Sequence, residues 1–132
     1  MGAMAVASPD IVSMLLEHGA SPLNLDINEN DALAFASVFG NIETSKYWLQ
    51  KFPHWNLNRR HGVAGGTVLT DALYMGQEMR YIELLLDHGA NVNVITKTGS
   101  SVLTTLCSSE DCDPRILSRL LKIKSTHPAS FV

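Results

Sequence analysis

The chain has 132 residues, a formal net charge of −3 and 45% hydrophobic residues, which is typical of a folded globular protein. The negative charge argues against general electrostatic attraction to nucleic acid or anionic lipid. No apolar run approaches the ~18 residues that a membrane-spanning helix requires, so we expect neither nucleic-acid binding nor membrane insertion. Two cysteines and no secretion signal predict an intracellular protein, cytoplasmic or nuclear.

The first seven residues are open to two interpretations. Gly2-Ala3-Met4 is short and small, as in a tag remnant, or else residues 1–7 form part of a first helix. We assign residues 8–122 to one repeat domain and residues 123–132 to a C-terminal tail.

Leucine residues recur at near-regular intervals and divide the chain into repeated units. In one series, each leucine is the last residue of an apolar helical stripe: Leu16, Leu49, Leu86 and Leu121. A second series stands between them, at Leu33, Leu69 and Leu103. Each unit is therefore predicted to hold two helices in a fixed order, in about four units of ~33 residues.

The first series predicts one set of helices, which we call outer. Their expected ranges are Pro9–His18, Ile42–Phe52, Met79–His88 and Asp113–Lys122. Proline follows a capping residue at the start of the first and last of these ranges, as is favoured at a helix N-terminus. Gly19 and Gly89 follow leucine-rich stretches, where a left-handed residue commonly ends a helix.

The second series predicts shorter, inner helices. Their expected ranges are Asp31–Phe39, Thr67–Met75 and Ser101–Cys107. Each begins with Asp, Thr or Ser, which can cap a helix. The first unit is expected to lack most of its inner helix. Polar loops with turn residues connect the units, at 24–30, 56–66 and 91–99.

One segment is nearly duplicated. Residues 11–20 read IVSMLLEHGA and residues 82–90 read IELLLDHGA, followed by Asn91-Val92-Asn93. Gly-Asn-Ile-Glu at 40–43 and Thr-Val-Leu-Thr-Asp-Ala at 67–72 add two further motifs. Together these motifs resemble the ankyrin-repeat family. The resemblance implies an all-α solenoid of stacked helix pairs with inter-repeat loops and β-turns, about four repeats long with incomplete terminal repeats.

The second unit departs from that pattern. Phe52-Pro53-His54-Trp55 stands where the family has Gly-Ala, and the loop that follows is three residues longer than its neighbours. We expect Tyr47, Trp48 and Phe52 to fill the gap with aromatic packing. Arg59, Arg60 and His61 are expected at the exposed tip of the long loop.

No catalytic, cofactor or metal site is expected. Cys107 and Cys112 could be zinc ligands, a regulatory disulfide, or a buried Cys107 with an exposed Cys112 in the loop, and we favour the last because a structural zinc site normally takes four ligands. His18 and His88 occupy equivalent positions before glycine, which indicates a structural role at helix ends. The glycine-rich run 62–66 lacks the Gly-Lys-Ser/Thr ending of a phosphate-binding loop.

The resemblance also implies that a partner binds the concave face formed by inner helices and loop tips. The outward positions predicted for this face are Phe35, Val38, Phe39, Asp71, Tyr74 and Met75, with Arg59 and Arg60 at the rim. Thr105, Ser108 and Ser109 continue the face in the last unit. A competing interpretation is that the three apolar positions of the second unit pack against a neighbouring element instead.

These observations predict a non-catalytic protein–protein interaction module that binds a partner protein or peptide. The alternative is a regulatory or targeting ankyrin domain of a larger enzyme or channel, with its chemistry elsewhere. A third possibility is self-association through exposed terminal repeats.

Overall fold

The computed structural model describes residues 2–108 and 112–126, with side chains through residue 123. Within these residues, regular secondary structure is entirely helical, apart from two isolated β-bridges. The helices are α1 (Ala3–Val6), α2 (Pro9–Glu17), α3 (Ala32–Phe39), α4 (Ile42–Lys51), α5 (Val68–Tyr74), α6 (Met79–Asp87), α7 (Val102–Cys107) and α8 (Pro114–Thr126). None of the helices in the described part of the chain has the length and apolar character needed to cross a membrane.

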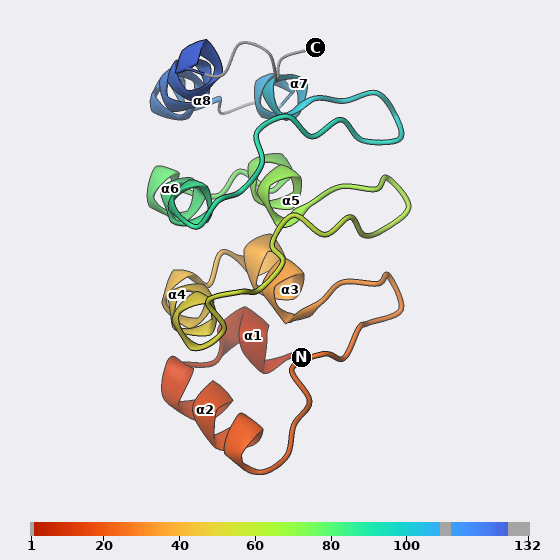
Figure 1. Ribbon diagram of the computed structural model, residues 1–132, viewed down its shortest axis with the longest axis vertical. Helices are drawn as coiled ribbons and strands as arrows, with labels where there is room; N and C mark the ends of the chain where they lie inside the picture. The colour runs from red at the N-terminus through yellow and green to blue at the C-terminus, as the bar shows by residue number, and fades with distance from the viewer. Residues whose placement is uncertain (1, 109–111, 127–132) are drawn as a thin grey trace.

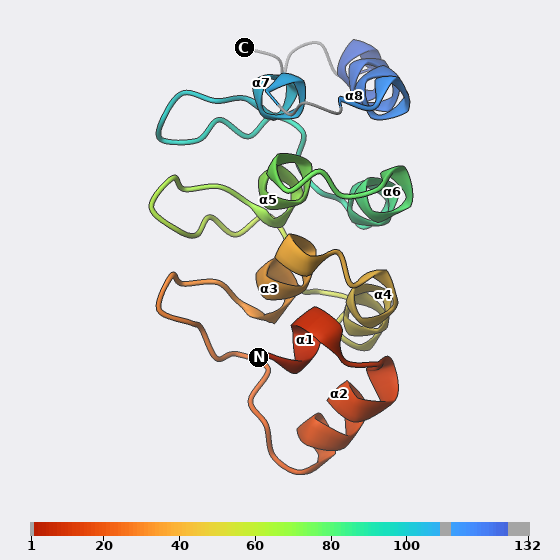
Figure 2. The same ribbon diagram turned by 180° about the vertical axis from the view of Figure 1, so that it is seen from behind.

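Consecutive helices form four pairs, and the pairs stack in one direction (Figure 1). The inner helices α1, α3, α5 and α7 contact one another in order, and so do the outer helices α2, α4, α6 and α8. The loops that join successive pairs project beyond the inner helices, as both views show (Figures 1 and 2). The second and third pairs thus bury their apolar faces between the pairs on either side, which one pair alone cannot do.

The inner helices start at side-chain caps, as their sequences predict. The Asp31 carboxylate accepts a hydrogen bond from the Ala34 amide at 2.9 Å. Thr67 and Thr70 form a reciprocal capping box, and the same arrangement recurs at the start of α7. These bonds satisfy backbone amides that have no partner within the helix.

The duplicated segments end their helices in the same way. His18 Nδ1 donates to Met14 O at 2.7 Å, and His88 Nδ1 donates to Leu84 O at 2.8 Å. The glycine that follows each histidine is left-handed, with φ of 94° and 89°. The repeated His-Gly pair is therefore a helix-ending device in which the imidazole satisfies a carbonyl of the last turn.

The last helix is longer than the sequence indicated. We expected it to end at Lys122, but α8 continues to Thr126, into the segment assigned to the tail. Ile123 extends the apolar stripe and packs against the core, which explains the additional turn. At its start, an Asp113 carboxylate oxygen accepts a hydrogen bond from the Arg115 amide at 2.9 Å.

Buried hydroxyl groups connect the second and third helix pairs. The hydroxyl of Tyr81 on α6 lies 2.9 Å from Ser37 Oγ on α3 and 2.7 Å from Ser45 Oγ on α4. All three side chains are buried. Burial raises the pKa of Tyr81, so its hydroxyl stays protonated and can donate. This polar contact joins three helices inside the core, and its satisfied hydrogen bonds favour one stacking register of the two pairs.

An aromatic cluster closes the end of α4, at the place where α2 and α6 are followed by Gly-Ala. Trp48 is buried, and its ring centroid lies 4.7 Å from that of Phe52 and 5.2 Å from that of Trp55. Tyr47 is partly buried against the core. The expectation that aromatic residues fill this position is confirmed, and Trp55 is a further member of the cluster.

Candidate functional site

The long loop 56–66 turns at Gly62–Gly65, and His61 does not lie at its tip. His61 pairs with Gly66 across the base of the turn, and its side chain is only 4% exposed. The expectation that His61 is a solvated tip residue is therefore wrong. Residues 62–65 form the turn at the tip, so His61 lies at the base of the turn with its side chain against α5.

His61 is held by a carboxylate on α5. Its Nε2 lies 2.5 Å from Asp71 Oδ2. Burial alone would lower the pKa of His61, but the hydrogen bond and charge of Asp71, with the charge of Asp31, raise it above its ordinary 6.5. The imidazole Nε2–H donates to the Asp71 carboxylate and fixes the loop to the first turn of α5.

The two arginines predicted at the rim tie neighbouring loops together. Arg59 Nη1 donates to Glu29 O at 2.6 Å in the preceding loop. Arg60 Nη1 donates to Gly65 O in its own loop and to Ile95 O, 2.6 Å away in the following loop. These charge-assisted bonds align three loops along one side of the molecule.

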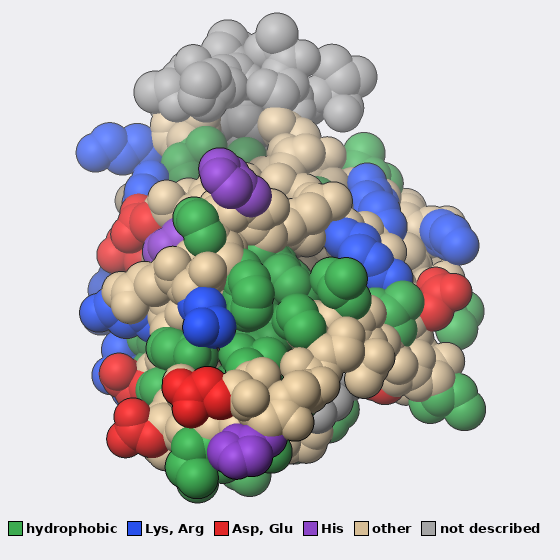
Figure 3. All heavy atoms as spheres, turned by 60° about the horizontal axis from the view of Figure 1, so that its bottom comes forward, with side chains coloured by type: hydrophobic (Ala, Val, Ile, Leu, Met, Phe, Trp, Pro, Cys, Tyr) green, Lys and Arg blue, Asp and Glu red, His purple; other side chains and the backbone are tan. Residues whose placement is uncertain are grey.

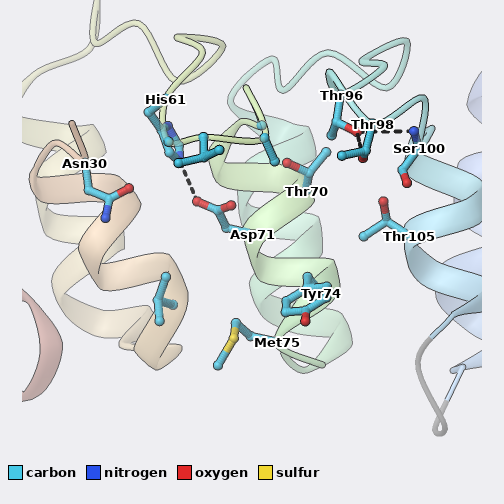
Figure 4. A pocket seen from close by; sticks show the side chains of 15 residues that line it. Asn30, His61, Thr70, Asp71, Tyr74, Met75, Thr96, Thr98, Ser100 and Thr105 are labelled. Carbon is cyan, nitrogen blue, oxygen red and sulfur yellow. Dashed lines mark hydrogen bonds and ion pairs between the residues drawn. The ribbon is translucent and has the colours of Figure 1, made fainter. Parts of the chain in front are cut away.

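A groove of about 500 Å³ lies between these loops and the inner helices (Figure 4). Its walls come from the ends of α3, α5 and α7 and from the loops 62–66 and 96–100. Figure 4 shows Tyr74 and Met75 toward the C-terminal end of α5, with His61, Asp71 and Thr70 toward its start. The groove is therefore apolar at one end and carries hydrogen-bonding groups at the other.

Four of the six predicted helix positions line this groove. They are Val38, Asp71, Tyr74 and Met75. Tyr74 is 73% exposed and Met75 49% exposed, so both side chains are accessible to a partner. Together with Val63 of the long loop, which is 95% exposed, these two residues give the groove accessible apolar surface.

The other two predicted positions lie outside the groove. Phe35 and Phe39 pack on each other, with ring centroids 5.3 Å apart. Phe35 is partly buried against the core, whereas Phe39 remains exposed. Phe35 therefore packs inside the molecule, as the interpretation that competes with partner binding expects for that residue. Phe35 and Phe39 form a patch on α3 that is separate from the groove.

The loop that precedes α7, together with α7 itself, contributes a wall of hydroxyl groups, most of which the sequence did not predict. Thr96 and Thr98 Oγ1 atoms lie 2.9 Å apart, and the Ser100 amide donates to Thr96 Oγ1 at 3.2 Å. Thr105 on α7 also lines the groove, as its register with Asp71 predicts. The Thr and Ser residues at 96–100 could have indicated a hydrogen-bonding surface, but such residues are equally typical of a turn.

Ser108, the next predicted position, is exposed, and Ser109 lies outside the described residues, as do the neighbouring Glu110 and Asp111. Both cysteines are free thiols, but Cys107 is exposed and Cys112 is partly buried, so the expectation of a buried Cys107 and an exposed Cys112 is wrong. Leu106 is the buried side chain at the end of α7, and Cys112 packs against the core. Over the described ranges, no group of three or more His, Cys, Asp or Glu side chains could hold a metal ion. The side chains that line the groove include an aromatic ring, a thioether, hydroxyl groups and a carboxylate, all of which can contact a partner.

Comparison with protein-family models and with curated protein sequences gave no match to this chain.

Proposed function

We propose that this chain is an ankyrin-type repeat domain that acts as a non-catalytic protein–protein interaction module. It binds a partner protein or peptide along the groove formed by the inner helices and loops. The observation that carries the proposal is the exposure of Tyr74 and Met75 in a groove of about 500 Å³.

Three features support the assignment of the fold. Helix pairs stack in a single direction, loops project on one side, and the duplicated His-Gly segments end α2 and α6 alike. A stack of this kind has an extended surface instead of an enclosed pocket, and such surfaces are suited to partner binding.

The exposed side chains are of the type that anchors a protein interface. Tyrosine and methionine supply large contact areas, and aromatic residues are enriched among the positions that dominate binding energy. Val38 across the groove adds apolar surface next to them. We expect the partner to place an apolar side chain between Val38, Tyr74 and Met75.

The opposite end of the groove is suited to polar groups of the partner backbone. Thr96, Thr98 and Ser100 come from one loop, and Asp71 lies across from them on α5 (Figure 4). Because His61 and the arginine bonds hold the loops in place, the groove is preorganised and loses little conformational entropy on binding. An extended peptide segment with one apolar anchor matches this arrangement.

The proposal can be tested with a random peptide library displayed on phage. Peptides enriched on the immobilised protein are synthesised, and their affinity is measured by calorimetry. The double variant Tyr74→Ala/Met75→Ala should bind at least ~10-fold more weakly, because truncating an anchor residue typically costs ~2 kcal/mol or more.

The matched control is Lys46→Ala/Gln50→Ala, which changes two exposed positions on the outer helix α4. Circular dichroism establishes that both double variants are folded. Equal affinity of the groove variant and the wild-type protein, or a similar loss in the control, would contradict the proposal.

A further inference from the structure

The two ends of the stack carry different kinds of exposed group. At the end with α1 and α2, hydrophobic side chains gather in the middle of the surface that Figure 3 brings forward. They include Met14 and Leu15 on α2, and self-association through this end stays a prediction. At the opposite end lie both cysteines of the chain, near the connection between α7 and α8. This second end therefore carries reactive groups.

The two thiols contact each other at this connection. Cys107 is the last residue of α7, and Cys112 stands two residues before the first residue of α8. The Cys112 side chain forms a hydrogen bond with the Cys107 side chain, although the two residues are five positions apart in the sequence. Because the side chain of cysteine ends at its sulfur, this hydrogen bond places the two sulfur atoms next to each other. The fold therefore brings both thiols together without a covalent bond.

The surroundings of the two thiols differ. Cys107 is exposed, whereas Cys112 is partly buried and packs against the core. Burial raises the pKa of the Cys112 thiol, and so do the neighbouring Cys107 thiol and the charge of Asp113. Since the attacking form is an accessible thiolate, Cys107 is the thiol that reacts first with a reagent from solution. Cys112 is placed to react second, with the sulfur of Cys107.

A covalent link at this position would act on the least supported helix pair of this end. Among the described helices, α7 and α8 contact each other and the third pair, with no further pair beyond them. The second and third pairs are packed on both sides, and stacked repeats depend on such neighbours for stability. A bond between the end of α7 and the approach to α8 would therefore supply a constraint that the inner pairs obtain from packing.

We infer that Cys107 and Cys112 form a reversible disulfide within one chain, by exchange with a small-molecule disulfide such as oxidised glutathione. The Cys107 thiolate attacks one sulfur of the small disulfide, and the bond that breaks releases one small thiolate, which takes up the proton that Cys107 lost. The Cys112 thiolate then attacks the Cys107 sulfur and releases the second small thiolate, which takes up the proton from Cys112. Two protein thiols are thereby oxidised, and one small disulfide is reduced to two thiols.

Equilibration of the folded protein with mixtures of reduced and oxidised glutathione tests this inference. After acid quenching, intact mass spectrometry separates unmodified chain, chain that carries glutathione and chain that has lost two hydrogen atoms. We expect the last species to predominate as the oxidised form, and a non-reducing gel should show single chains.

The same mixtures in urea provide a matched control, because the unfolded chain has the same two thiols at the same sequence separation. The equilibrium constant for disulfide formation should be at least ~10-fold larger in the folded protein, since closing the loop in the unfolded chain costs conformational entropy. Equal constants for the folded and unfolded chains would overturn the inference. So would oxidation of the wild-type protein that yields only glutathione adducts or disulfides between chains.

Two single variants test the order of attack. Cys112→Ser keeps the exposed thiol and should accumulate the glutathione adduct, whereas Cys107→Ser keeps the partly buried thiol and should react more slowly. Circular dichroism establishes that both variants are folded. Faster modification of Cys107→Ser would contradict the assignment of Cys107 as the first thiol to react. Because both thiols lie outside the groove, none of these results bears on the proposed function.

Discussion

The helices α4 and α6 occupy equivalent places in neighbouring pairs, yet they end by different means. α6 ends through local contacts: the His88 imidazole donates to a carbonyl of the last turn, and Gly89 adopts the left-handed conformation. α4 has no such glycine and ends on side chains, with Trp48, Phe52 and Trp55 packed together. The stack therefore keeps its geometry through either a local backbone turn or tertiary packing.

This difference determines where each pair is vulnerable. A backbone turn depends on one conformationally permissive residue and involves few contacts with the rest of the chain. An aromatic cluster depends on buried area, so its loss opens a cavity in the core. We expect substitutions in the second pair to cost more than substitutions at the equivalent place in the third.

The largest effect is expected from Trp48→Ala. Removing the buried ring should lower the free energy of unfolding by ~3–5 kcal/mol, because the site loses both transfer free energy and packing contacts. Urea unfolding followed by circular dichroism measures this. Lys46→Ala on the exposed face of the same helix should remain within about 0.5 kcal/mol of the wild-type protein. Wild-type stability of Trp48→Ala would show that the aromatic cluster does not hold the second pair.

Tyr81→Phe tests the contact between the two pairs under comparison. It removes the hydroxyl shared by Ser37 and Ser45, leaving two buried hydroxyls without that partner. We expect a loss of about 1–3 kcal/mol in the same unfolding measurement. Tyr74→Phe, which changes an exposed ring, serves as the control and should be close to neutral. Equal stability of the two variants would mean that the buried hydroxyl network adds nothing.

Gly89→Ala isolates the backbone turn at the end of α6. A side chain at Gly89 meets no atom within 4 Å, so the penalty is that of the left-handed conformation alone. That penalty is about 1–2 kcal/mol for a residue other than glycine. Gly89→Asn should recover part of the loss, because asparagine tolerates this conformation. If alanine and asparagine were equally destabilising, some contact other than backbone strain would be responsible.

The smallest effect is expected from the His61–Asp71 pair. Because the pKa of His61 is raised above 6.5 in the folded state, the pair stabilises the fold fully below that value. This contribution is lost as the pH rises through the folded pKa. Wild-type stability should therefore fall relative to that of His61→Gln as the pH is raised from 6.5 into the alkaline range. A constant difference between the two proteins across that range would contradict this.

The fold was largely predictable because its signals are local. Leucine spacing, the Asp31, Thr67 and Ser101 caps and the His-Gly pairs each depend on neighbours in the sequence, and helix bounds followed to within a residue or two except at the end of α8. The groove was only partly predictable because it is assembled from distant segments. Nothing local in the sequence indicates that His61 folds back onto Asp71.

The same limit applies to the arginines. A pair of charged residues in a loop is expected in solvent, but Arg59 and Arg60 bond to carbonyl groups 30 and 35 residues away in the sequence. Such contacts depend on how the loops align after the helices have stacked. As rim contacts for a partner, both arginines stay a prediction.

Amide NMR of the isotope-labelled protein, titrated with an enriched peptide, tests most directly whether the peptide binds in the groove. The largest chemical-shift changes are predicted around Val38, Asp71 and Tyr74, and in the loop 96–100 that forms the facing wall. Changes confined to the outer helices α4 and α6, with the groove resonances unmoved at saturation, would contradict the claim.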